Sequence, residues 1–413
     1  MTHTVRRACT ACGSTGLDLF LDLGMSPVAD AYTIHPARLP GSQVERFPLR
    51  AAVCASCRLV QLVDILDGKT LFGTGYSFHS SASAPLSAYH ADYARDLIND
   101  DDLAMLAPGR SVVEIGCNDG DMLRHFVAAG VCAYGVDPAA GPVAVARSRG
   151  LDVVGEPFGL STAETLRSTR GPADLVVANH VLAHVEDVSD FLAGVRHLLA
   201  DDGRAVFEVQ YLPDLLLNNA FDLIYHEHRN FFSLASLCAA AGRHGLVYDT
   251  HLTTGRQGGS LRAWFRPGAD ADIQHAGVRC IARERWLTEP ATYAGMQGRA
   301  EQVRERLWDL LSGLLGRTKA AYGAPAKLTT LAAFCDLDVE DIAWIQDTTT
   351  AKQGRYLPGT SIPIVAPVSG DAGRPDVYLL SAWNYAGPIM RQEARFTTTG
   401  GQWLVPFPAP VLL

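Results

Sequence analysis

The segment SVVEIGCNDG, residues 111–120, indicates the fold of the largest part of this chain. An apolar run of strand length ends in glycine, and a helical pattern, DMLRHFVAAG at 121–130, follows at once. The same alternation continues downstream through the strand-like runs AYGVD (133–137), ADLVVAN (173–179) and RAVFEVQ (204–210). Apolar strands separated by amphipathic helices are typical of a parallel sheet with helices on both faces. We therefore predict an α/β fold with a doubly wound sheet in the middle of the chain.

The glycine turn between the first strand and its helix predicts a ligand at the positive end of that helix. A dinucleotide fingerprint needs glycine where this chain has Asn118 and Asp121, which crowd a pyrophosphate and add negative charge. The turn suits a cationic cofactor such as S-adenosylmethionine. Asp137 ends the second strand and is expected to accept the ribose hydroxyls, although an aspartate before Pro138 also suits a plain turn. The residues predicted to contact the cofactor are Glu114, Gly116, Asn118, Gly120, Asp137, Phe158 and Asn179.

Cysteines near the N-terminus form two Cys-x-x-Cys pairs, Cys9 with Cys12 and Cys54 with Cys57. Four thiolates on two such turns can close a tetrahedral zinc site. The alternative is a redox pair of the thioredoxin kind, but no strand-and-helix pattern surrounds either motif. We predict a structural zinc ion that holds residues 1–70 together, because that segment is too small to be stable alone.

The composition excludes several classes of protein. Of the 413 residues, 48% are hydrophobic and 19% are charged, which is typical of a globular enzyme rather than a disordered or fibrous chain. The charges sum to −9, so the positive footprint of a nucleic-acid-binding protein is missing. We found no apolar run that reads as a signal peptide or a membrane span. We expect a soluble, cytoplasmic enzyme that binds neither nucleic acid nor membrane, and the sequence leaves its oligomeric state open, a monomer included.

Changes of pattern divide the chain into four parts. We predict a zinc-binding domain at 1–70, a linker or lid with a helix at 71–105, and the cofactor domain at 106–268. A helical connection and a second, Rossmann-like α/β domain follow at 269–413. In this last part a loop after a strand, YGAPAK at 322–327, places a lysine where a diphosphate could bind. The basic residues that predict a diphosphate or nucleoside contact there, with solvated surface charge as the alternative, are Lys327, Lys352 and Arg355.

A series of motifs along the chain carries a resemblance to a known family. After the cysteine pairs they are GYSFHSS (75–81), VEIGCNDG (113–120), ANHVLAHV (178–185), NNAFDLIYHEH (218–228) with FFS after it, YGAPAK (322–327), KQGRYLPGT (352–360) and SAWN (381–384). In this order they resemble the nucleotide-sugar C-methyltransferases of deoxysugar and antibiotic biosynthesis, over essentially the whole chain. The resemblance implies an N-terminal zinc domain, a central class I S-adenosylmethionine domain and a C-terminal Rossmann-like domain.

The resemblance also implies a reaction, methylation at carbon 3 of a thymidine-diphosphate 4-keto-deoxysugar. A ketone at carbon 4 acidifies the proton on carbon 3, so a base can form an enolate that attacks the methyl group of S-adenosylmethionine. The motifs imply that His228 is this base, with Tyr225 and Glu227 beside it to orient it or relay the proton. Tyr76 and His184 are implied to lie near the sugar oxygens. The residues implied to bind the substrate are His180, Gln210, Tyr211, Phe78, Lys327, Lys352 and Arg355.

The chain departs from the family at His180, Gln210 and Phe78, where family members have Asn, Pro and often Tyr. These departures leave open which sugar is used and whether methylation is the sole reaction. A keto-sugar reductase using a nicotinamide cofactor, alone or alongside methylation, is the alternative function, and a non-catalytic binding protein is a third. Two alternatives apply to His226, Glu227 and His228, which could form a solvated loop or part of a metal site with His180 and His184. Val181 stands where a metalloprotease helix has glutamate.

Overall fold

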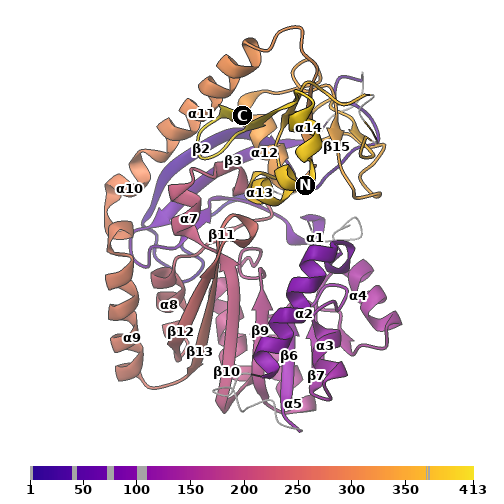
Figure 1. The fold of residues 1–413 in the computed structure, drawn as a ribbon. Coiled ribbons are helices and arrows are strands. Elements are labelled where there is room, and N and C mark those ends of the chain that lie inside the picture. The colour runs from indigo at the N-terminus through magenta and orange to yellow at the C-terminus, as the bar shows by residue number, and fades with distance from the viewer. Residues whose placement is uncertain (1–2, 40–43, 72–78, 100–108, 369, 371–372) are drawn as a thin grey trace.

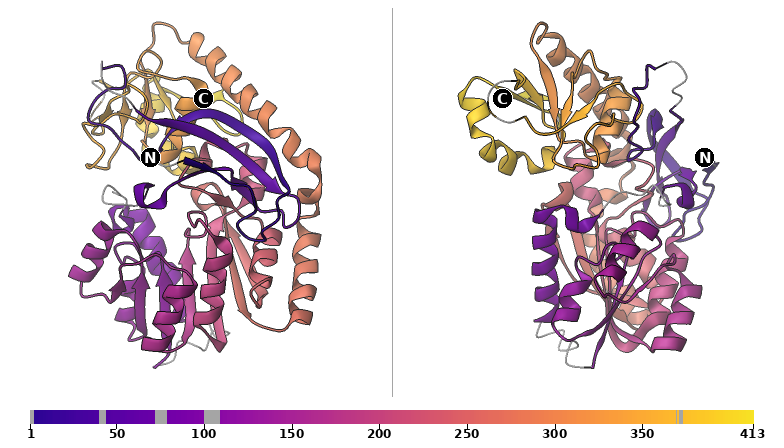
Figure 2. Two further views of the ribbon diagram at one scale, coloured as in Figure 1. Left: turned by 180° about the vertical axis from the view of Figure 1, so that it is seen from behind. Right: turned by 90° about the vertical axis from the view of Figure 1, so that its right-hand side faces the viewer.

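A computed structural model describes residues 3–39, 44–71, 79–99, 109–368, 370 and 373–413. The structure has three parts, each built around a sheet (Figures 1 and 2). A large sheet with its helices forms the lower half, and the N-terminal and C-terminal sheets lie side by side over its upper end. The observed α/β architecture confirms the predicted fold class.

The central sheet has seven strands in the order β12-β13-β10-β9-β6-β7-β8. Its parallel part pairs β6 with β7 and β9, β7 with β8, and β9 with β10, whereas β12 and β13 form an antiparallel edge. The strands are β6 (Ser111–Ile115), β7 (Cys132–Val136), β8 (Val153–Val154), β9 (Ala173–Asn179), β10 (Leu199–Gln210), β12 (Leu246–Thr254) and β13 (Ser260–Pro267). The alternation read from the sequence is thus a parallel sheet with an added hairpin.

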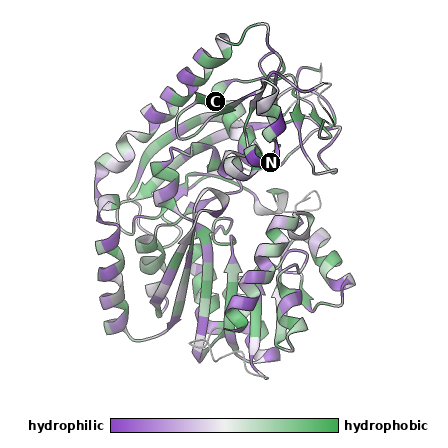
Figure 3. Ribbon diagram, in the orientation of Figure 1, coloured by the Kyte–Doolittle hydropathy of each residue, from purple (hydrophilic) through white to green (hydrophobic). Residues whose placement is uncertain are grey.

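Amphipathic helices cover both faces of this sheet. Apolar side chains of these helices are buried against it, and most of the helices turn polar residues to solvent, a pattern visible in the hydropathy colouring of Figure 3. They are α2 (Ala84–Ile98), α3 (Leu123–Ala128), α4 (Ala140–Ser148), α5 (Leu160–Arg170), α6 (Val188–Leu198) and α8 (Leu234–Gly242). Because parallel strands end at one edge of the sheet, the loops after β6, β7, β9 and β10 gather there, as expected for a ligand site.

The N-terminal domain contains a four-stranded sheet in the order β11-β4-β3-β2. Its strands are β2 (Leu17–Pro27), β3 (Arg46–Cys54), β4 (Val60–Leu62) and β11 (Asn230–Phe231), and a small ribbon pairs β1 (His3–Val5) with β5 (Asp64–Leu66) before the single turn of α1 (Gly68–Leu71). Strand β11 comes from the segment that follows the YHEH motif, some 170 residues away along the chain from β4. The motif therefore lies directly before a strand of the N-terminal sheet.

The C-terminal domain has a six-stranded sheet in the order β16-β15-β14-β17-β18-β19, parallel except for β19. The strands are β14 (Lys319–Tyr322), β15 (Ile345–Gln346), β16 (Ile364–Val365), β17 (Val377–Leu379), β18 (Gln402–Val405) and β19 (Val411–Leu412). The helices are α12 (Ala326–Cys335), α13 (Ala386–Gln392) and α14 (Ala394–Thr398), with the 3-10 turn η6 (Trp383–Tyr385). The connection to this domain runs along one side of the molecule as α9 (Asp270–Arg283), α10 (Pro290–Ala294) and α11 (Met296–Ser312) (Figure 1).

One apolar core joins the three parts. It contains Leu49 and Leu62 of the N-terminal sheet, Phe221 from the segment after α7 (Leu212–Leu217), and Leu331 of α12. Buried aliphatic and aromatic side chains dominate the stability of such a core, since each contributes about 1.5–3 kcal/mol. The segment that carries the YHEH motif is thereby fixed between the N-terminal and C-terminal domains.

Candidate active site

The turn after β6 has the backbone geometry that a closely bound ligand requires. Gly116, Asn118 and Gly120 all have positive φ values, of 70°, 50° and 78°. A Cβ atom at Gly116 would lie 2.3 Å from Cγ2 of Val181, so only glycine fits there. The turn leads into α3 at Leu123, and the backbone N–H groups of Gly116, Asn118 and Gly120 donate to Val136, Asp137 and Cys117.

Asp137 braces this turn from the end of β7. Its Oδ2 accepts the backbone N–H of Asn118 at 2.9 Å, and its Oδ1 accepts that of Ala139 at 2.8 Å. Burial raises the pKa of the Asp137 carboxyl, and the two N–H groups counteract this increase. Each carboxylate oxygen can accept more than one hydrogen bond, so the same group can also receive the hydroxyls of a ligand.

Several buried oxygens around the turn have no protein partner among the described residues. They are Oε2 of Glu114, Oδ1 of Asp119 and Oδ1 of Asn179. An unpaired buried acceptor costs about 1–3 kcal/mol, so acceptors gathered beside a glycine turn indicate a ligand that donates hydrogen bonds. Burial and the carboxylates of Asp137 and Asp121 raise the pKa of Glu114 well above its usual value. A cation such as the amino and sulfonium groups of S-adenosylmethionine fits these residues, whereas a pyrophosphate does not.

Phe158 is half-buried after β8 and packs edge-to-face on Phe191, with ring centroids 5.3 Å apart. It keeps an accessible face near the end of the strands, which is compatible with the predicted stacking on adenine. That role for Phe158 stays a prediction.

The two Cys-x-x-Cys pairs converge in the N-terminal domain. The Sγ atoms of Cys9, Cys12, Cys54 and Cys57 all lie within 4.8 Å of one another, with 3.5 Å between Cys9 and Cys57 and 3.6 Å between Cys12 and Cys54. Thiolates bound to one zinc ion at about 2.3 Å lie about 3.8 Å apart, so the four residues fit tetrahedral zinc. Within the part of the chain that the structure describes, no second cluster of potential ligands was found, the histidines near the YHEH motif included.

The YHEH motif places a histidine and a tyrosine in direct contact. The Tyr225 hydroxyl lies 2.7 Å from Nε2 of His228, and the two rings are 4.0 Å apart. Nδ1 of His228 lies 3.1 Å from the carbonyl oxygen of Leu223, which can only accept. Nδ1 therefore carries the proton, and Nε2 is the basic nitrogen that accepts from Tyr225. Burial and the neighbouring His184 lower the pKa of His228 well below its usual value, so the ring is neutral near pH 7.

Two further histidines lie beside this pair. The ring centroid of His184 is 5.0 Å from that of His228, and Nδ1 of His184 donates to the carbonyl of Glu227 at 2.6 Å. Burial lowers the pKa of His184 to about 4. His180, with a φ of 55°, places Nε2 3.4 Å from the carboxylate of Glu208. The three histidines thus share one region at the end of β9 and β10.

Sequence reasoning missed a charged network behind His180. Glu208 is 1% exposed, and it accepts from the Tyr89 hydroxyl at 2.5 Å and from Arg262 at 2.8 Å. Arg262 also lies over the ring of Tyr93, at 3.1 Å from the centroid. The signal was the alternation in β10, which puts Glu208 and Gln210 on one face of a buried strand. Charged residues on that face need partners, and those partners come from α2 and β13.

Glu227 meets the N-terminal domain at Asp30, which sequence reasoning also missed. The backbone N–H of Asp30 donates to Oε1 of Glu227 at 3.2 Å, whereas Oε2 of this buried residue has no partner among the described residues. Burial and the nearby Asp30 carboxylate raise the pKa of Glu227 to about 7. Asp30 is exposed as a residue whereas Glu227 is 4% exposed, so the pair lies where the interior meets the surface. Nothing in the run VADAY at 28–32 marks Asp30 as special.

The substrate residues predicted near β10 occupy different environments. Gln210 is 6% exposed and its Oε1 lacks a partner among the described residues, which leaves an acceptor on the face shared with Glu208. The hydroxyl of Tyr211 instead donates to Glu284 at 2.7 Å, and Glu284 also accepts the N–H groups of Leu234 and Ala235 at the start of α8. The structure therefore places the Tyr211 hydroxyl in a helix-capping network. Tyr76 and Phe78 lie outside the described residues.

The basic residues of the C-terminal domain have protein partners. The Lys327 ammonium is almost fully buried and donates to Oδ1 of Asn384 at 2.8 Å. Lys352 donates to the carbonyl of Ala324 at 2.8 Å and lies 4.8 Å from the ring of Tyr32. Arg355 donates to the carbonyl of Tyr32 at 3.3 Å. Surface charge, the alternative reading of Lys327, is wrong, and Lys352 and Arg355 lie at the contact with the N-terminal domain.

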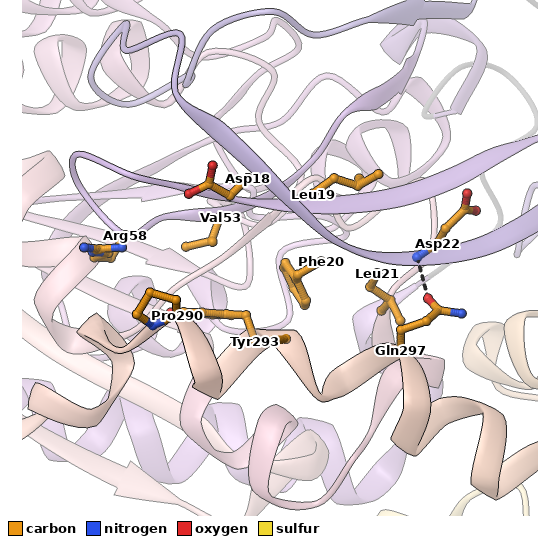
Figure 4. A pocket seen from close by; sticks show the side chains of 11 residues that line it. Asp18, Leu19, Phe20, Leu21, Asp22, Val53, Arg58, Pro290, Tyr293 and Gln297 are labelled. Atoms are coloured by element: carbon orange, nitrogen blue, oxygen red, sulfur yellow. Dashed lines mark hydrogen bonds between the residues drawn. The ribbon is translucent and has the colours of Figure 1, made fainter.

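A groove of about 460 Å³ lies elsewhere, between β2 and the helices α10 and α11 (Figure 4). Its floor is the pair Phe20 and Tyr293, with ring centroids 5.3 Å apart, and Gln297 accepts the backbone N–H of Asp22 at 2.9 Å. None of the predicted site residues lines it. The groove is therefore separate from the predicted site at the ends of β6, β7, β9 and β10.

Comparison with known proteins agrees with this arrangement. Three family models match the chain, a zinc binding domain over residues 9–72, a methyltransferase domain over 89–251 and a C-methyltransferase C-terminal domain over 255–408. C-methyltransferase NovU of Streptomyces niveus is 37% identical over 412 residues, which span 97% of this chain and 96% of the relative. The chain belongs to this C-methyltransferase family. It is an S-adenosylmethionine-dependent enzyme with a zinc-binding domain, as the sequence predicted.

More distant matches cover less than half of this chain. A ubiquinone biosynthesis O-methyltransferase of Aeromonas salmonicida is 25% identical over 179 residues, which are 40% of this chain and 74% of that protein. The S-adenosylmethionine-bound structure of magnesium protoporphyrin IX methyltransferase from Synechocystis PCC 6803 is 17% identical and covers 48% of this chain and 88% of its own, with a TM-score of 0.34. Among the described residues of this C-methyltransferase, no helix is both long and apolar enough to cross a membrane.

Proposed function

We propose that this C-methyltransferase methylates carbon 3 of a thymidine-diphosphate 4-keto-deoxysugar through an enolate. The contact between the Tyr225 hydroxyl and Nε2 of His228, at 2.7 Å, carries the proposal. Carbon-carbon bond formation needs a carbanion equivalent, and a base beside a ketone generates one by removing the adjacent proton. The relative from Streptomyces niveus, a C-methyltransferase by name, supports this class of reaction.

The steps assigned to the chain follow from the hydrogen bonds. The Leu223 carbonyl keeps the proton on Nδ1 of His228, so Nε2 can remove the proton from carbon 3 by relay: the Tyr225 hydroxyl gives its proton to Nε2 and its oxygen receives the proton from carbon 3. We assign the sugar contacts to His184, whose ring lies 5.0 Å from that of His228, and to Oε1 of Gln210, which has no partner among the described residues. The cofactor supplies an electrophilic methyl group, and Glu114, Asp137 and Asn179 would hold it beside the glycine turn. Lys352 and Arg355 are proposed to meet the nucleotide.

Solvent exchange tests the enolate directly. When S-adenosylhomocysteine replaces the methyl donor in D₂O, deuterium should enter carbon 3 of the keto-sugar, because proton removal is reversible without methyl transfer. Deuterium at carbon 5 instead would contradict the assigned position, since a 4-ketone acidifies both neighbours. Oxidation of a nicotinamide cofactor by the same protein would support the alternative function, a keto-sugar reductase.

The cofactor site gives a further prediction. Asp137→Ala should weaken S-adenosylmethionine binding at least tenfold, because each hydrogen bond to a charged group contributes about 1.5–3 kcal/mol. Calorimetric titration measures the affinity. Asp152→Ala, at an exposed aspartate just before β8 that pairs with Arg170 of α5, is a matched control and should bind normally. Unchanged affinity in a folded Asp137→Ala protein would remove Asp137 from the site.

The pH dependence of kcat/KM should contain a transition that arises from ionisation of the Glu227 carboxyl. Because its pKa is raised to about 7, Glu227 gains a negative charge as the pH rises through 7. We expect activity to rise over this range, since only the ionised carboxylate can receive a proton relayed from the pair His228 and Tyr225. The His228 transition lies lower, because the pKa of that histidine is lowered well below 6.5.

Two variants separate these assignments. Glu227→Gln should abolish the transition near pH 7, and Asp30→Asn should move it to lower pH, because the negative charge that raises the Glu227 pKa is removed. A transition that stays in place in both variants would show that another group titrates there.

A further inference from the structure

We infer that the C-terminal domain positions the catalytic base. Lys327 and Trp383 bind the side chain of Asp222, and this contact fixes the carbonyl of the next residue, Leu223, which orients His228. This inference rests on the proposed role of His228. Lys327 and Trp383 are then positioning residues, which act through the backbone of another segment, and the domain that carries them is part of the catalytic machinery.

The orientation of His228 depends on one short turn. The 3-10 helix η3 (Phe221–Leu223) ends at the residue whose carbonyl accepts from Nδ1 of His228 at 3.1 Å. This bond decides which ring nitrogen is basic, because the carbonyl can only accept. A displacement of the Leu223 carbonyl would therefore release the ring and permit the other tautomer.

The C-terminal domain contacts this turn at the residues on both sides of Leu223. On one side, Oδ2 of Asp222 accepts from Nε1 of Trp383 at 2.7 Å and lies 3.8 Å from the Lys327 ammonium. On the other side, the carbonyl of Ile224 accepts from the Thr330 hydroxyl at 3.0 Å. Helix α12, which carries Lys327 and Thr330, lies above the ends of the central strands (Figure 1).

The ion pair of Lys327 and Asp222, which anchors the turn, is buried. The side chains of Lys327 and Asp222 are 7% and 1% exposed. The ammonium also lies 4.0 Å from the centroid of the Trp383 ring and donates to Asn384, so two residues of η6 and Asp222 of η3 surround it. Removal of one partner from such a pair leaves an uncompensated buried charge, so the geometry of the turn is strongly determined by this contact.

The arrangement distinguishes positioning from substrate binding. The Lys327 ammonium contacts the side chains of Asp222, Asn384 and Trp383. These contacts surround the ammonium and do not orient it toward a phosphate. Loss of the anchor should therefore act on the base, through kcat, and leave the binding of S-adenosylmethionine unchanged. The Leu223 carbonyl raises the pKa of His228, so loss of that bond should move the acidic limb of the rate profile to lower pH.

Trp383→Phe tests the inference with little change of shape. Phenylalanine keeps an aromatic ring beside Lys327 but removes the N–H that Asp222 accepts. We expect kcat to fall about tenfold or more, because small displacements of a reacting group are costly, while KM for S-adenosylmethionine stays within about twofold. The acidic limb of kcat should shift to lower pH, a change that a merely structural role would not produce.

Trp344→Phe is the matched control, because Nε1 of Trp344 has no partner among the described residues of the same domain. Its kcat and pH profile should equal those of the unaltered enzyme. Thr330→Val removes the other anchor with a side chain of equal shape and is judged by the same criterion, so it decides the outcome if Trp383→Phe fails to fold.

Three results would overturn the inference. They are a Trp383→Phe enzyme with the kcat and pH profile of Trp344→Phe, a loss confined to KM for the sugar nucleotide, and a fall in kcat without any shift of the acidic limb. Failure of the proposed function looks different, since His228→Asn would then retain solvent exchange whatever the Trp383 variant does.

Discussion

Replacement of His228 by asparagine should lower both methylation and deuterium entry at carbon 3 by about a hundredfold or more. The asparagine amide can still donate to the Leu223 carbonyl, which Nδ1 contacts at 3.1 Å in the structure, so the local shape is kept. The basic nitrogen that faces the Tyr225 hydroxyl is lost, and no other atom replaces it. Mass spectrometry of the keto-sugar recovered from D₂O measures exchange, and transfer of a labelled methyl group measures the complete reaction.

His226 offers a matched control two residues away. It is buried like His228, and its Nε2 donates to the carbonyl of Pro48 at 3.1 Å, a contact inside the N-terminal domain. His226→Asn should therefore keep exchange and methylation within a few fold. If His228→Asn exchanged deuterium at nearly the normal rate across pH, the base would lie elsewhere, with His184 and His180 next to be tested.

The fold of the central domain was predictable because its signals are local. The strand-glycine-helix pattern at 111–130 needs only neighbouring residues to be recognised, and the structure has β6, the turn and α3 there. The N-terminal sheet was not predictable in the same way. Strand β11 joins β4 by pairing Asn230 with Gln61, and nothing in either sequence shows this distant pairing.

The predicted site residues were found by motif, and those missed have no motif. Tyr225, Glu227 and His228 stand in one run of four residues, so recognising the run located all of them. Asp30 and Glu208 acquire significance only through the buried groups that they face, namely Glu227 and Arg262. Contacts between distant segments decide such roles, and single-sequence patterns do not contain them.

Lys327 is a second residue whose role the sequence alone could not show. A lysine at the start of a helix after a glycine loop is a reasonable phosphate ligand, and this reading follows from general rules. Burial beside Asp222 changes the reading, because the carboxylate comes from a segment more than 100 residues earlier in the chain. Charge, helix position and loop composition were visible in the sequence, whereas the partner was not.

Loss of zinc should abolish activity by destroying the N-terminal domain. Metal binding to structural sites of this kind contributes about 10–16 kcal/mol in zinc-finger peptides, far more than a small sheet gains by itself. Cys54 ends β3 and Cys57 lies in the turn before β4, so the ion fixes the strand to which β11 is paired. Cys54→Ser should yield protein with less than one zinc per chain, a lower Tm and no methylation. Elemental analysis and thermal unfolding measure the first two changes.

Strands β4 and β11 connect the zinc site to the YHEH motif. The backbone N–H of Leu62 donates to the carbonyl of Arg229 at 2.9 Å, directly after His228, and Asp30 of the same domain contacts Glu227. Cys132→Ser is the matched control, because this cysteine is exposed at the start of β7 and far from the cluster in the chain, so zinc content and activity should be unchanged. Zinc-free protein with full activity would mean that the hydrogen bonds of the sheet hold the YHEH segment without the ion, and the metal would then have no part in shaping the site.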